Sequence, residues 1–167
     1  MRLVVRERMV AVGDDYWIED ENGNKIYLVD GKAMRLRATF DLKHGRTDKV
    51  LLRIHQKVVA LRGTMVIDRD GETLATVRRK RLSLLRNHYT VTMADGTELN
   101  VSGRIVDREF AVEHRGELLA VVSRRWLTLR DTYGIDIVRE DADAPLLVAV
   151  AICVIQLAEK DRAGGDG

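Results

Sequence analysis

The sequence contains very few cysteine, proline and aromatic residues. Its 167 residues include one cysteine, one proline and 5% aromatic residues. A single thiol, Cys153, excludes an internal disulfide and is typical of a protein from a reducing compartment. One proline excludes a collagen-like or proline-rich disordered chain. The hydrophobic content of 46% is instead that of an ordinary globular protein.

The sequence also lacks a strong excess of either charge. Its 28 basic and 26 acidic residues leave a formal net charge of +2. Long-range attraction to nucleic acid should therefore be weak. Few aromatic side chains are present on which bases could stack. Nucleic acid is not the partner that this composition favours.

Motifs that indicate catalysis, a cofactor or a metal site are missing as well. The four histidines are scattered without metal-ligand spacing. Neither a Gly-x-Gly-x-x-Gly phosphate loop nor a Gly-x-Ser-x-Gly nucleophile elbow occurs. Acidic pairs such as Asp68 and Asp70 lie at a predicted hairpin tip, where turn chemistry explains them. We therefore expect no enzyme, no cofactor and no metal. A catalytic site that assembles only on folding is the weaker alternative.

Residues 144–158 form the most informative segment, because they carry no charge and are apolar around the whole circumference of a helix. Such a helix must be buried on every side. At about 1.5 Å per residue it reaches only ~22 Å, short of the roughly 30 Å of a bilayer core, so no transmembrane segment is expected. Asp143 is the predicted N-cap, just before Pro145. A core helix is favoured over a tail that leaves the protein to insert into a membrane.

The preceding 140 or so residues predict short strands joined by tight turns. In the clearest run, Met34, Leu36, Ala38, Phe40 and Leu42 alternate with polar residues that include Thr39 and Asp41, which indicates one buried and one wet face. Turn signals fall at Asn22-Gly23, Asp30-Gly31, Asp70-Gly71, Asp95-Gly96 and Arg115-Gly116. Ten to twelve strands are predicted. Closing them into a barrel would cover the helix on all sides and leave no free strand edge.

These observations predict one mainly β domain over residues 1–160, with a central helix at about 144–159 and a disordered tail at 161–167. The N-terminal residues Met-Arg-Leu-Val-Val-Arg-Glu-Arg are too charged for the apolar core of a signal peptide. We therefore expect a cytoplasmic protein.

The order of these features resembles the LURP-one-related family, whose fold is that of the Tubby C-terminal domain. The resemblance lies in residues 20–31, in residues 68–74 (Asp-Arg-Asp-Gly-Glu-Thr-Leu) and in residues 126–137, which end in Asp-Thr-Tyr-Gly-Ile-Asp-Ile, followed by the apolar helix. It implies a closed antiparallel barrel of about twelve strands around a buried C-terminal helix. It implies little chemistry, because the biochemical role of the family is largely undefined. Its distant relatives include the phosphoinositide-binding tubby proteins and the phospholipid scramblases, and none of their head-group residues can be placed here.

The most prominent polar feature is a pair of basic runs. The first is Arg78-Arg79-Lys80-Arg81, and the second, Arg124-Arg125, precedes a tryptophan. If adjacent strands carry them, they could form one cationic patch for phosphate head groups. The hypothesis from sequence is thus a non-enzymatic binding or scaffold module that contacts anionic phospholipid through these six residues, peripheral to a membrane. The alternative is a structural or protein-interaction module with no lipid ligand, in which the runs are only a solvated face. The oligomeric state stays open.

Overall fold

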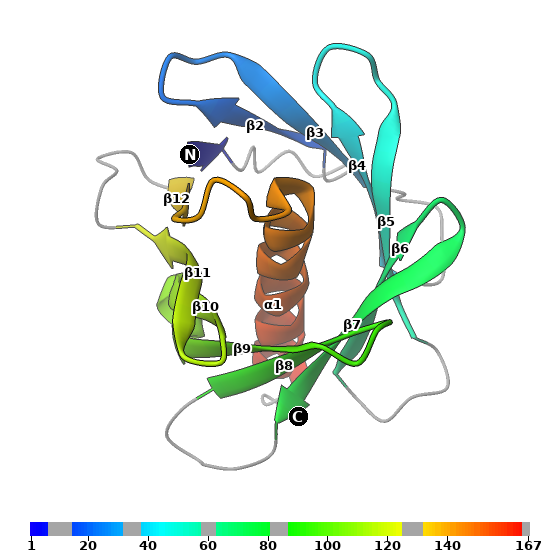
Figure 1. Cartoon of the computed structure of the whole chain (residues 1–167), viewed down its shortest axis with the longest axis vertical. Helices are drawn as coiled ribbons and strands as arrows, with labels where there is room; N and C mark the ends of the chain where they lie inside the picture. Colours follow the sequence, from blue (N-terminus) through cyan, green and yellow to red (C-terminus); the bar gives the residue numbers. More distant parts are fainter. Residues whose placement is uncertain (7–14, 32–37, 58–62, 81–86, 125–131, 165–167) are drawn as a thin grey trace.

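The chain folds into a closed antiparallel barrel around one helix (Figure 1). The computed structural model describes residues 1–6, 15–31, 38–57, 63–80, 87–124 and 132–164. Within these residues the strands are β1 (Arg2–Arg6), β2 (Tyr16–Asp20), β3 (Lys25–Gly31), β4 (Thr39–His44), β5 (Val50–Gln56), β6 (Thr64–Arg69), β7 (Glu72–Lys80), β8 (Asn87–Met93), β9 (Glu98–Arg104), β10 (Glu109–His114), β11 (Glu117–Ser123) and β12 (Thr132–Ile137). A 3₁₀ turn, η1 (Ile105–Asp107), joins β9 to β10, and the helix α1 spans Ala144–Gly164.

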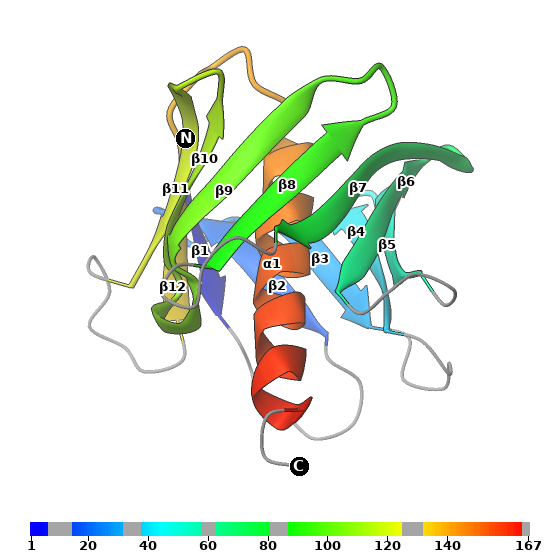
Figure 2. The ribbon, with the colours of Figure 1, turned by 90° about the horizontal axis from the view of Figure 1, so that it is seen from below.

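Each strand pairs with its sequence neighbours, and β12 closes the barrel by pairing with β1. The two ends of the barrel therefore differ. At one end, here called the turn end, lie the short hairpin turns and the start of α1. At the other, the helix-exit end, the odd-numbered strands finish and α1 emerges (Figure 2). The predicted barrel of about twelve strands around a C-terminal helix is confirmed.

The core consists of the inward side chains of the strands and nearly the whole apolar part of α1. Every residue from Leu146 to Ile155 is at most 7% exposed, so the helix is enclosed on all sides, as its sequence predicts. Asp143 is the N-cap: its Oδ1 accepts a hydrogen bond from the amide of Leu146 at 3.1 Å. No helix among the described residues has the combination of length and hydropathy that crossing a bilayer requires.

Four of the five predicted turns carry glycine at positive φ: Gly23, Gly71, Gly96 and Gly116. The fifth prediction is wrong. Asp30 and Gly31 belong to β3 and pair with β4, so strand pairing overrides the local turn preference there.

The predicted alternation in residues 34–42 is only partly correct. Phe40 and Leu42 are buried, whereas residues 34 and 36 lie outside the described part of the chain. Thr39 and Asp41, expected on a wet face, are 5% and 2% exposed. Asp41 is buried although it points away from the core, because its carboxylate is held against the guanidinium of Arg53 on the next strand.

The helix also extends further than the apolar run. It continues to Gly164, so the first four residues of the predicted disordered tail are helical. The segment Glu159-Lys160-Asp161-Arg162-Ala163 explains this, because four of its residue types, Glu, Lys, Arg and Ala, are among the good helix formers. Residues 165–167 lie outside the described part of the chain.

Candidate functional site

The first basic run lies at the end of β7. Arg78, Arg79 and Lys80 are its last three residues, and all three are exposed. Arg124 directly follows β11 and is also exposed. The remaining two predicted residues, Arg81 and Arg125, lie outside the described residues.

The described residues of both runs lie at the helix-exit end, but not on adjacent strands. The barrel places β8, β9 and β10 between β7 and β11. At about 4.8 Å per strand, the four steps from β7 to β11 amount to roughly 19 Å along the barrel wall. The condition for a single cationic patch, that adjacent strands carry the two runs, is therefore not met. Each strand pairs with its sequence neighbour, so the intervening hairpins must separate them.

A further cation joins the first run. The amide of Lys57, just after β5, donates to the carbonyl of Thr64 at 3.2 Å, and Thr64 in turn pairs with Arg78. Lys57 and Arg78 thus flank the start of β6 from its two sides. We call Lys57, Arg78, Arg79, Lys80 and Arg124 the basic rim. Sequence reasoning did not single out Lys57, because it is an isolated lysine outside any motif.

Cations on the rest of the barrel are mostly matched by acids. Arg6 contacts Glu19 at 3.1 Å, and Arg69 contacts Asp143 at 2.7 Å. Between the two parts of the rim, Arg104 lies 2.6 Å from Glu109, and Arg108 lies 3.1 Å from Glu159 at the end of α1. These pairs neutralise the wall between β7 and β11.

The basic rim differs, because its cations are exposed and mostly unmatched. Lys57, Arg78, Lys80 and Arg124 form no ion pair with any residue that the structure describes. The exposed guanidinium groups of Arg78 and Arg124 are open to water or to an anion. Arginine can present two parallel N–H groups to a phosphate, and lysine a point charge.

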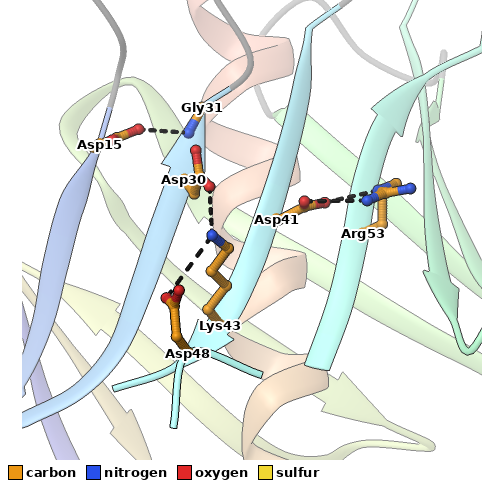
Figure 3. A network of polar contacts seen from close by, with 7 residues as sticks. All are labelled: Asp15, Asp30, Gly31, Asp41, Lys43, Asp48 and Arg53. Carbon is orange, nitrogen blue, oxygen red and sulfur yellow. Dashed lines mark hydrogen bonds and ion pairs between the residues drawn. The ribbon is translucent and has the colours of Figure 1, made fainter. Parts of the chain in front are cut away.

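A second set of charges lies on the outer face of β3, β4 and β5 (Figure 3). Lys43 Nζ is 2.7 Å from Asp30 Oδ2 and 3.8 Å from Asp48 Oδ1. Arg53 binds Asp41 through two hydrogen bonds of 2.7 and 3.1 Å. The hydrogen bond that Lys43 donates to Asp30 raises the pKa of Lys43, and the hydrogen bonds that Arg53 donates to Asp41 raise the pKa of Arg53. Each cation is already bound to a carboxylate, so this network fastens neighbouring strands together.

An imidazole–carboxylate pair adjoins this network. His55 Nε2 lies 2.8 Å from Asp68 Oδ2, on neighbouring strands. In a nucleophilic triad the hydroxyl contacts the imidazole. Here the hydroxyl of Thr73 contacts the carboxylate of Asp68 instead, at 3.3 Å. Because the carboxylate of Asp68 lies between the imidazole of His55 and the hydroxyl of Thr73, the imidazole cannot take the hydroxyl proton and Thr73 is not activated as a nucleophile.

The described residues contain no cluster of three or more histidine, cysteine or acidic side chains able to hold a metal ion. Cys153 is fully buried in the middle of α1, and this burial raises the pKa of its thiol. A thiol held neutral in an apolar core is a poor nucleophile and a poor metal ligand.

The fold and the rim define a class of protein: a twelve-stranded barrel closed around an apolar helix, with a charged outer surface. The sequence profile of the LURP-one-related family matches residues 1–155, and the chain belongs to that family.

Two comparisons agree with this assignment. The chain is 22% identical over 162 residues to the uncharacterized protein YxjI of Bacillus subtilis (strain 168), covering 97% of this chain and 96% of the relative. It also resembles the X-ray structure of a protein from Arabidopsis thaliana, with a TM-score of 0.67 and 15% identity over 95% of this chain and 91% of the other. At that identity the likeness shows a shared fold. The proteins named in these comparisons carry no enzymatic description.

Proposed function

We propose that this protein is a non-enzymatic binding module that attaches to anionic phospholipid head groups through its basic rim. It would then act in the cytoplasm at the periphery of a membrane. The observation that carries the proposal is the set of exposed cations without ion-pair partners among the described residues: Lys57, Arg78, Lys80 and Arg124. The sequence places two further arginines, Arg81 and Arg125, directly after members of this set.

The expected affinity is modest. Each Lys or Arg close to an anionic leaflet contributes about 1 kcal/mol, so four such residues contribute about 4 kcal/mol. That corresponds to roughly a thousandfold preference for an anionic over a neutral surface. Because the attraction is electrostatic, it should fall steeply as the salt concentration rises.

The test is flotation with vesicles of phosphatidylcholine alone and of phosphatidylcholine mixed with phosphatidylserine. The wild-type protein should float with the mixed vesicles only. Reversing two charges of the rim, Arg78→Glu with Lys80→Glu, should weaken the partition at least about 30-fold, because about 2 kcal/mol of attraction is lost.

A matched control exists at the turn end. Arg46 and Lys49 are exposed and lie in the turn between β4 and β5. Replacing both by glutamate changes the net charge by the same amount and should leave flotation much less affected. Equal effects of the two double variants would mean that only the net charge matters, which contradicts a site at the rim.

Negligible binding of the wild-type protein to both vesicle types would overturn the proposal. It would favour the alternative, a structural or protein-interaction module with no lipid ligand. One form of that alternative is already disfavoured by the fold. A partner strand needs a free sheet edge, but every strand in the described part of the chain pairs on both sides.

A further inference from the structure

The turn end of the barrel contains a pocket of about 240 Å³ that the proposed lipid-binding rim does not use. It lies between the β8–β9 hairpin, β11, the connection that precedes α1, and the first turns of α1 itself. Figure 2 shows the connection from β12 to α1 at the same end as the β8–β9 and β10–β11 turns. The lining residues are Met93, Asp95, Thr97, Leu99, Leu119, Arg139, Asp141, Ala142, Asp143, Leu146 and Leu147.

The inner part of this pocket is apolar. Leu99, Leu146 and Leu147 are buried core residues, and Met93 and Leu119 are partly buried against the same core. At about 30 Å³ for each non-hydrogen atom, the volume holds roughly eight such atoms. An aliphatic or aromatic body of that size would replace water next to five apolar side chains.

The charged groups of the pocket favour a cation. Three carboxylates and one guanidinium line it, which gives a net charge of −2. The guanidinium is that of Arg139, and it is already held by Asp141 at 2.6 and 2.8 Å and by Glu117 at 2.6 Å. Its positive charge is therefore compensated, and a ligand anion would have to compete with two carboxylates for it.

Asp95 is the carboxylate best placed to meet a ligand. It is exposed, and its Oδ1 accepts a hydrogen bond from the amide of Thr97 at 2.8 Å. This hydrogen bond lowers the pKa of Asp95, so the group is ionised at neutral pH. His114 adds a smaller electrostatic contribution in the same direction.

The start of α1 does not reverse this preference. A free helix N-terminus attracts anions. Here the carboxylate of Asp143 already accepts a hydrogen bond from the amide of Leu146, and its second oxygen binds Arg69 at 2.7 Å. The protein's own carboxylate thus occupies the position that a ligand anion would take.

We propose that this pocket binds a small organic ammonium ion: an apolar body of about six to eight carbons seated on Met93, Leu119 and Leu147, with its ammonium group at Asp95. The site is independent of the basic rim, because it lies at the opposite end of the barrel.

The test uses three probes of equal length: hexylamine, 1-hexanol and hexanoate. Binding is followed by NMR of protein with ¹³C-labelled methionine methyl groups, in which the Met93 signal reports on the pocket. Hexylamine should shift the Met93 signal and saturate it at the lowest concentration, 1-hexanol should bind more weakly, and hexanoate should bind weakest.

The variant Asp95→Asn keeps the turn but removes the charge. It should lower the affinity for hexylamine about threefold to fivefold while leaving the affinity for 1-hexanol unchanged.

Asp70→Asn is the matched control, since Asp70 is an exposed turn aspartate outside the pocket. It should leave all three affinities unchanged. Ala142→Leu partly fills the pocket and should weaken both hexylamine and 1-hexanol. The proposal is overturned if no probe shifts Met93, if hexanoate binds as well as hexylamine, or if Asp95→Asn and Asp70→Asn have the same effect.

Discussion

Truncating Ile152 is the perturbation whose cost follows most directly from the structure. Ile152 lies near the middle of α1 and is 1% exposed, enclosed by the barrel wall. Ile152→Val removes one carbon and should lower the free energy of unfolding by about 0.5–1.5 kcal/mol. Ile152→Ala removes three and should lower it by about 2–5 kcal/mol, because a closed barrel cannot collapse onto the space left behind.

Urea denaturation followed by circular dichroism measures these changes in the free energy of unfolding. If the slope of that free energy against urea concentration is the same in the variants, the substitutions have changed stability and not the compactness of the unfolded state. The control is Val138→Ala, because Val138 is 50% exposed, and this change should cost less than about 0.5 kcal/mol. The reasoning fails if Ile152→Ala costs no more than Val138→Ala, since the helix would then not be enclosed in solution.

Three further changes test local features. Asp143→Ala should destabilise by about 1 kcal/mol more than Asp143→Asn, because asparagine keeps the helix cap and loses only the ion pair. Gly45→Ala should cost about 1–3 kcal/mol, because a Cβ there would collide with the carbonyl oxygen of Lys25. A double-mutant cycle with alanine at Asp41 and Arg53 should give a coupling of about 1 kcal/mol, since Asp41 is buried while the guanidinium stays partly in water.

Each of these changes in the free energy of unfolding is measured by the same urea denaturation. Equal stability of the two Asp143 variants would mean that the cap contributes nothing. An unchanged stability of Gly45→Ala would mean that this turn can shift freely, and additive effects at Asp41 and Arg53 would mean that their hydrogen bonds are not formed in solution.

The parts of the fold that the sequence predicted are those decided by local pattern or by burial. An uncharged stretch with no polar face can only be enclosed, and α1 is enclosed. The cap at Asp143 and the glycine turns follow from the chemistry of a few neighbouring residues. The turn predicted at Asp30 failed because its outcome depends on β4, a strand that follows eight residues later.

The sites were harder to predict because they depend on strand order. The two basic runs were recognisable individually, but only the closed meander reveals that three strands separate them. Lys57 joins the rim through the pairing of β5, β6 and β7, which no local pattern contains. The pocket combines the β8–β9 hairpin with β11 and with the start of α1, which lie further along the chain. The sequence showed Asp95 only as part of a turn and Asp143 only as a helix cap, so no local pattern indicated that they line one pocket.

The most direct measurement of the enclosed helix is the reactivity of Cys153, the single thiol in the sequence. Its burial raises the pKa of the thiol, so Cys153 should stay protonated in the folded state. The same burial should keep a thiol reagent from reaching the sulfur atom. We expect a thiol reagent to modify Cys153 only as fast as the barrel opens, with a rate that rises with urea alongside unfolding. Modification at the rate of an unfolded peptide under native conditions would contradict a helix enclosed by the barrel.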